Sequence, residues 1–121
     1  MKYLLLVHHN EAAFDQINDA VRQKLLSESI ALTHRLHADK QYISASPLHP
    51  VTTAALVRVR NGKALVTDGP FIETREQIAG YYLIDAPDKS AAFEIAKRVP
   101  GARIGTVEVR PVVELAGLPG D

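Results

Sequence analysis

The densest group of residues capable of chemistry is a short run in which Asp68, Glu73 and Glu76 surround Arg75. A carboxylate can transfer a proton while a nearby guanidinium holds an anionic group of a substrate. We therefore expect Asp68 to act as an acid or base, with Arg75, Glu73 and Phe71 contributing to substrate binding. The Asp-Gly-Pro-Phe segment also has a structural interpretation, in which Asp68 caps its own turn and Phe71 fills the core.

Two adjacent histidines, His8 and His9, end the first apolar run of the chain. Successive side chains of a strand point to opposite faces, so at most one of them can face a pocket. That histidine is expected to pair with Asp68 as a catalytic partner, and Tyr81 or Tyr82 would donate a hydroxyl. The alternative is a polar strand end. No histidine pair has the spacing and carboxylate partner of a metal site, so no metal is expected.

Three further charged residues stand among apolar ones. Glu28 interrupts the apolar stripe of the first long helix, where it is either a buried acid with a raised pKa or a residue at the edge of the stripe. Glu108 and Arg110 alternate with valines in the last strand. They predict either an ion pair across strands or subunits, or the floor of a pocket.

The elements that must position these residues follow from hydrophobic periodicity and turn residues. Helices are expected from an N-cap at Asp15 to about Leu36, and from Asp88 to Val99. Asn61-Gly62 predicts a two-residue turn between two strands, and Gly80 predicts a bulge or a close approach of backbones. Strands are expected at 3–7, 41–45, 51–60, 63–67, 78–84 and 106–112.

This order predicts an α+β fold, a ferredoxin-like βαββαβ sandwich with an inserted hairpin at Asn61-Gly62. Two helices can cover only one face of the sheet. The other face must be polar or covered by a partner, and we expect a homodimer in which sheet packs on sheet.

Composition narrows the function classes. The 121 residues suffice for one domain, expected at 1–115 with a frayed tail at 116–121. Fourteen basic residues balance fourteen acidic ones, which argues against nucleic-acid binding. No apolar run is long enough for a membrane span, and the N-terminus is unlike a signal peptide, so a cytoplasmic location is expected. Because phosphate-binding and dinucleotide motifs are absent from the sequence, no cofactor is expected.

The segment VTDGPFIETREQIAGYYLI at residues 66–84 resembles the signature of the YCII-related family, specifically its DGPF branch. The similarity extends to MKYLL at the start of the chain, to Val57-Arg58 and to VEVRP at residues 107–111. The resemblance implies a ferredoxin-like, dimeric α+β-barrel fold. Related proteins carry a proposed His–Asp dyad; Asp68 matches the aspartate of the DGPF motif, whereas Ser29 stands near the position of the histidine.

Two functions follow as expectations. The first is a cofactor-independent acid–base enzyme, similar to a lyase, acting on a small organic acid, with Asp68 as the essential carboxylate and His8 or His9 as its partner. The second is a non-catalytic ligand-binding or regulatory module, because members of the DGPF branch often accompany sigma factors. A purely structural dimer is the third alternative.

Overall fold

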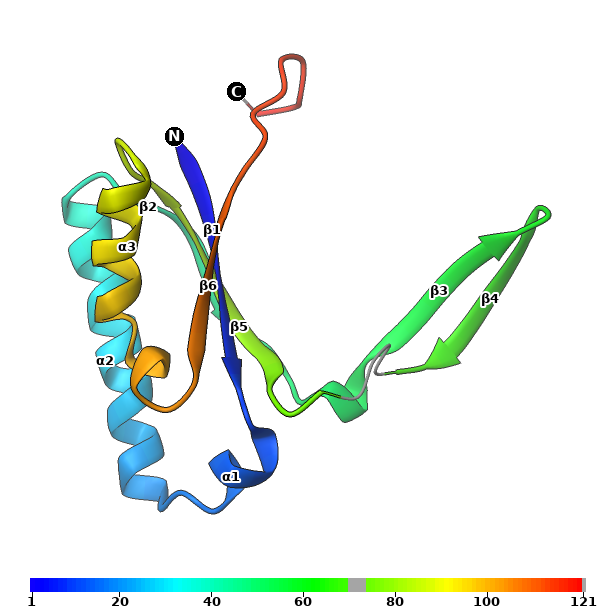
Figure 1. Cartoon of the computed structure of the whole chain (residues 1–121), viewed down its shortest axis with the longest axis horizontal. Helices are drawn as coiled ribbons and strands as arrows, with labels where there is room; N and C mark the ends of the chain where they lie inside the picture. The colour runs from blue at the N-terminus through cyan, green and yellow to red at the C-terminus, as the bar shows by residue number, and fades with distance from the viewer. Residues whose placement is uncertain (70–73, 121) are drawn as a thin grey trace.

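The computed structural model describes residues 1–69 and 74–120, and within them a four-stranded antiparallel sheet carries the fold (Figure 1). Its strand order is β2-β5-β1-β6, in which β1 is Lys2–His9, β2 Tyr42–Pro47, β5 Gln77–Asp85 and β6 Thr106–Pro111. Two helices, α2 (Asp19–Ala38) and α3 (Lys89–Arg98), connect these strands. This mixed α+β topology is compatible with a ferredoxin-like fold.

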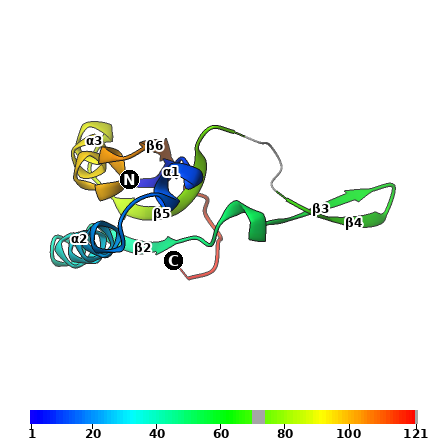
Figure 2. The same cartoon turned by 90° about the horizontal axis from the view of Figure 1, so that it is seen from below.

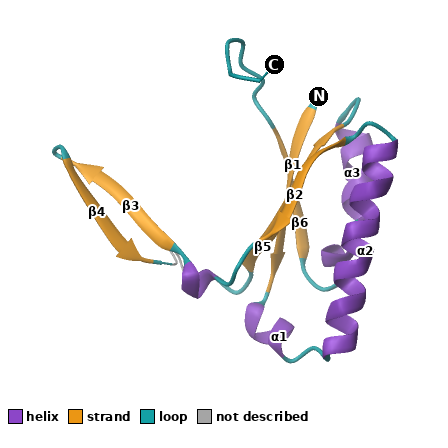
Figure 3. Ribbon diagram, turned by 180° about the vertical axis from the view of Figure 1, so that it is seen from behind, coloured by secondary structure: helices purple, strands orange, loops and turns teal. Residues whose placement is uncertain are grey.

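Both long helices lie on the same face of the sheet, so the opposite face is left open (Figures 2 and 3). Every second residue of β1 is buried beneath the helices: Tyr3, Leu5 and Val7. They pack with residues of β5, α2 and α3, namely Tyr82, Ile84, Leu32, Leu36, Ala92, Ile95, Ala96 and Val99. Within the described residues, no helix is long and apolar enough to cross a membrane.

The first helical region consists of two helices rather than one. A short helix, α1 (Glu11–Asp15), precedes α2, and the Asn10 side chain caps it by accepting from the Ala13 amide. Asn18 caps α2 by accepting from the amides of Ala20 and Val21. The predicted cap at Asp15 is therefore wrong, because asparagine side chains on either side satisfy the first free amides of each helix.

The remaining strands, β3 (Ala55–Arg60) and β4 (Lys63–Asp68), pair only with each other. The turn between them has positive φ at Asn61 (53°) and Gly62 (74°), as the Asn-Gly pair predicts. A 3₁₀ turn, Val51–Thr53, occupies the start of the expected strand 51–60. The hairpin extends from the body on the side opposite the helices (Figures 1 and 3).

Two glycines allow strands to approach closely near the end of β1. A Cβ at Gly80 would lie 2.9 Å from the Ser46 carbonyl oxygen, and one at Gly105 would lie 2.0 Å from that of His8. The pairing of β1 with β5 also shifts register between Val7 and His8, opposite Gly80. Gly80 thus combines the close approach and the bulge that the sequence predicts.

Candidate functional site

A cavity of about 320 Å³ lies between the first half of α2 and the sheet. Its walls are mainly apolar, and Leu25, Leu26 and Ile30 of α2 face Val7 and Ala45 of the strands. The helix therefore keeps part of its apolar surface uncovered by protein, and its buried residues, Leu32 and Leu36, belong to the second half. Cavities of this size and lining bind small ligands.

His9 brings an ionisable group to this cavity from the end of β1. Its ring stacks on Phe14 of α1, with centroids 4.5 Å apart and planes inclined by 18°. Burial lowers the pKa of His9, although the nearby carboxylates of Glu11, Asp15 and Glu76 oppose this effect. The ring nitrogens make no hydrogen bond to any described residue. His9 can therefore present a neutral imidazole to a bound molecule.

A cation lies at the same end of the cavity. Arg22 of α2 lines the cavity, and its guanidinium carbon is 6.0 Å from the centre of the Phe14 ring. It pairs with Asp19, one turn earlier on the same helix, whose side chain is exposed. Exposed pairs of this kind stabilise a protein by at most about 1 kcal/mol, so an anionic ligand can compete for the guanidinium.

Two hydroxyl groups also line the cavity, one from α2 and one from β5. Ser29 of α2 hydrogen-bonds to Tyr82 of β5, and both residues line the cavity. Burial raises the pKa of Tyr82, while the bond from Ser29 partly opposes the rise. Tyr82 thus stays protonated near neutral pH, as a hydroxyl donor must. Tyr81 also borders the cavity, but it alternates with Tyr82 along β5, so its side chain lies on the open sheet face. There its hydroxyl is 3.1 Å from the Ser44 hydroxyl.

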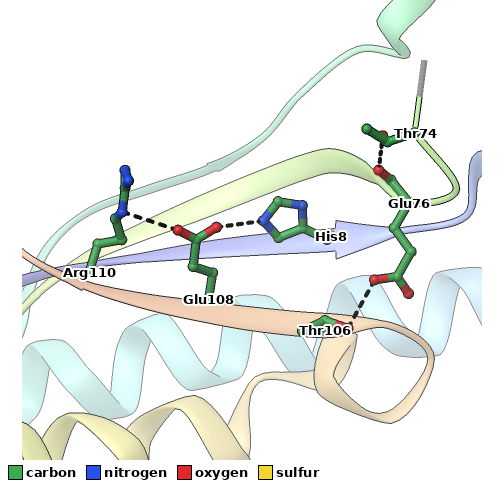
Figure 4. A network of polar contacts seen from close by, with 6 residues as sticks. All are labelled: His8, Thr74, Glu76, Thr106, Glu108 and Arg110. Carbon is green, nitrogen blue, oxygen red and sulfur yellow. Dashed lines mark hydrogen bonds and ion pairs between the residues drawn. The ribbon is translucent and has the colours of Figure 1, made fainter. Parts of the chain in front are cut away.

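His8 lies on the other face of β1, as the alternation of a strand predicts, and joins a polar network there (Figure 4). Its Nε2 is 3.0 Å from Oε1 of Glu108, and Nε of Arg110 forms an ion pair with the other carboxylate oxygen at 3.1 Å. Nearby, the Thr106 hydroxyl donates to Glu76 at 2.9 Å. The cross-strand contact of Glu108 is with His8 of β1, whereas its ion pair with Arg110 lies within β6.

In the part of the chain that the structure describes, neither Asp68 nor Arg75 pairs with His8 or His9. Asp68 ends β4 with an exposed side chain, and Arg75 is exposed shortly before β5. Within the described residues, neither side chain makes a hydrogen bond or ion pair. Phe71 and Glu73 lie outside the described residues. The structure therefore brings together His9 and Tyr82, but it brings neither the Tyr81 side chain nor Asp68 to them.

No pattern in the sequence marks Phe14, Arg22 and Ser29 as a group. Phe14 is the aromatic residue of a polar segment, and Ser29 interrupts an apolar stripe. Both residues could therefore have been singled out from the sequence. The other interruption, Glu28, is half-buried and pairs with Arg103 at 2.6 Å. Among the residues that the structure describes, no three histidine or acidic side chains converge to hold a metal ion.

A family model of the YCII-related domain matches residues 1–116. An uncharacterized protein of Rhizobium meliloti (strain 1021) is 31% identical over 120 residues, which cover 93% of this chain and 92% of that protein. The match spans the cavity, the sheet and the hairpin alike. The chain belongs to the YCII-related family.

Proposed function

We propose that this protein binds a small, mainly apolar organic acid in the cavity between α2 and the sheet. The apolar cavity of about 320 Å³, with Arg22 and His9 at one end, carries the proposal. Its walls favour the hydrocarbon part of a ligand, and the guanidinium favours a carboxylate. Ser29 and Tyr82 supply hydroxyl groups that fix orientation.

Benzoate and phenylacetate are suitable probes because each combines one carboxylate with a compact ring. Calorimetric titration should detect binding, and Arg22→Gln should weaken it about tenfold or more, as expected for the loss of a charge-assisted contact. Arg98→Gln is the matched control, since Arg98 is exposed at the end of α3 and does not line the cavity.

A second pair of variants tests the cavity itself. Ser29→Leu places a larger apolar group in the cavity and should abolish binding of either probe. Ser27→Leu makes the same change at an exposed position of the same helix and should leave binding intact. Equal affinity of both variants for phenylacetate would contradict the location of the site.

Acid–base catalysis is the second candidate function, and the neutral His9 imidazole favours it. A histidine with a lowered pKa is a base at neutral pH, and Tyr82 keeps its proton for donation. Asp68 and Arg75 enter this site only if another copy of the chain supplies them. Turnover of a small acid that is lost in His9→Gln but not in the control His34→Gln would support an enzyme. Binding without turnover would support a ligand-binding module.

We also propose that the chain forms a homodimer through the open face of its sheet, as in the dimeric α+β barrels that the family resemblance implies. Leu4 and Leu6 of β1 and Leu83 of β5 lie on this face, beside the polar network of His8, Glu108 and Arg110. An apolar area with a polar border is typical of subunit interfaces. Light scattering that finds a monomer at micromolar concentration would contradict the dimer.

A further inference from the structure

The hairpin of β3 and β4 stands away from the rest of the chain (Figures 1 and 2). Its strands form a separate two-stranded sheet, and neither is hydrogen-bonded to a strand of the main sheet. A two-stranded hairpin is at best marginally stable by itself in water, and packing against another surface stabilises it. This hairpin therefore needs a surface on which to pack.

One face of the hairpin is apolar along its length. Val57 pairs directly with Val66, and Val59 lies on the same face; their exposed fractions are 67%, 69% and 61%. We call this the valine face. The opposite face carries the basic residues of the hairpin, namely Arg58, Arg60 and Lys63. Contiguous exposed apolar residues with a charged surround mark an interaction site.

The total surface indicates how much is left to cover. The chain exposes 8650 Å², whereas a compact monomer of 13.2 kDa exposes roughly 6400 Å² by the scaling of surface with mass. The excess of about 2200 Å² exceeds the roughly 800 Å² that each partner covers in a stable interface of standard size. The area is sufficient for a dimer that includes both the hairpin and the open sheet face.

The position of the hairpin indicates what covers it. It extends on the side of the open sheet face, where the partner of the proposed dimer lies (Figure 3). A twofold dimer uses the same surfaces in both copies, so each hairpin meets the body of the other copy while each sheet face receives a hairpin. The hairpin of each copy thus covers the open sheet face of the other copy across the symmetry axis.

We infer that the hairpin is an arm that docks, through its valine face, on the body of a second copy of this chain. This inference rests on the proposed homodimer and adds the surface that holds it together. Asp68 alternates with Thr67 and lies on the valine face, at the base of the arm. The arm therefore carries the Asp68 carboxylate toward the other copy.

The test compares two neighbouring positions of β4. Val66→Asp places a charge on the valine face, and Thr67→Asp places the same charge on the opposite face. Sedimentation equilibrium should show the dimer dissociation constant of Val66→Asp raised about thirtyfold or more, as for loss of an interface hot spot. Thr67→Asp should dimerise like the wild type. Circular dichroism and phenylacetate binding verify that both variants remain folded.

Hydrogen exchange of the wild-type protein gives an independent readout. Amides of β3 and β4 should exchange more slowly as the dimer forms with rising concentration, because the docked arm is covered. Exchange that does not change with concentration, or equal dimerisation of both variants, would overturn the arm while leaving a sheet-face dimer intact. A wild-type protein that is monomeric would overturn both, and binding to the cavity would be unaffected.

Discussion

His9 is the residue whose chemistry depends most on its surroundings. Its imidazole lies against Phe14 in a mainly apolar cavity, where burial disfavours the charged form and lowers the pKa. His8, its neighbour in sequence, instead meets the Glu108 carboxylate on the open sheet face. A single step along β1 thus separates an imidazole in an apolar cavity from one in an ionic network.

The lowered pKa of His9 predicts a pH dependence of stability. The unfolded chain binds a proton at the ordinary histidine pKa, above that of the folded state, so the folded state loses stability as pH falls below about 6.5. Urea unfolding at pH 7.5 and at pH 5 measures this effect. Between these two pH values, the free energy of unfolding should fall less for His9→Gln than for the wild type. The control His34→Gln, at an exposed position of α2, should lose as much as wild type.

Gly105 provides a second prediction at the scale of single residues. A methyl group there would meet the His8 carbonyl oxygen at 2.0 Å, so β1 and the start of β6 would have to separate. Gly105→Ala should lower the free energy of unfolding by about 1–3 kcal/mol. Gly80→Ala should lower the free energy of unfolding by less, because the atom nearest to its added Cβ is 2.9 Å away. The reverse order in urea unfolding would contradict this steric explanation.

At the scale of elements, the division between α1 and α2 decides the shape of the cavity. Ending α1 at Asp15 turns the chain so that Phe14 and Arg22 lie at the same end of the cavity. The first half of α2 then spans the cavity, and only its second half packs tightly on the sheet. Apolar residues recur along both halves of α2 and lie on more than one side of the helix, so periodicity alone could not distinguish core from cavity wall.

The caps of these helices predict opposite outcomes for two nearby substitutions. Asn18→Ala removes the acceptor of two amides at the start of α2 and should cost about 1 kcal/mol. Asp15→Ala removes an exposed side chain that caps neither helix and should change stability by less than about 0.5 kcal/mol. Thermal unfolding of both variants would measure the difference. A larger loss of stability in Asp15→Ala than in Asn18→Ala would support the single helix, capped by Asp15, that the sequence predicts.

At the scale of the whole molecule, the chain combines one well-packed body with surfaces that remain uncovered. The core between sheet and helices is continuous, whereas the hairpin and the open sheet face are exposed. The C-terminal segment also has exposed apolar residues, among them Val113, Leu115 and Leu118.

The tail beyond the last strand should contribute little to folding. Its described side chains are exposed, and β6 ends at Pro111. Removing residues 116–121 should therefore change the free energy of unfolding by less than about 0.5 kcal/mol. A larger loss in urea unfolding would place the tail within the domain, contrary to the boundary expected after residue 115.

The sequence by itself determined the kinds of elements and their order, because hydrophobic periodicity and turn residues act locally. Asn61-Gly62 specified the hairpin turn, alternation along β1 separated His8 from His9, and the signature around Asp68 indicated the family. Only the tertiary structure decided which side chains meet. Glu108 pairs with His8, and Ser29 meets Tyr82, across gaps of 100 and 53 residues that no local pattern encodes. Such contacts depend on how strands and helices pack, and that packing places the cavity at α2 and leaves Asp68 on the hairpin.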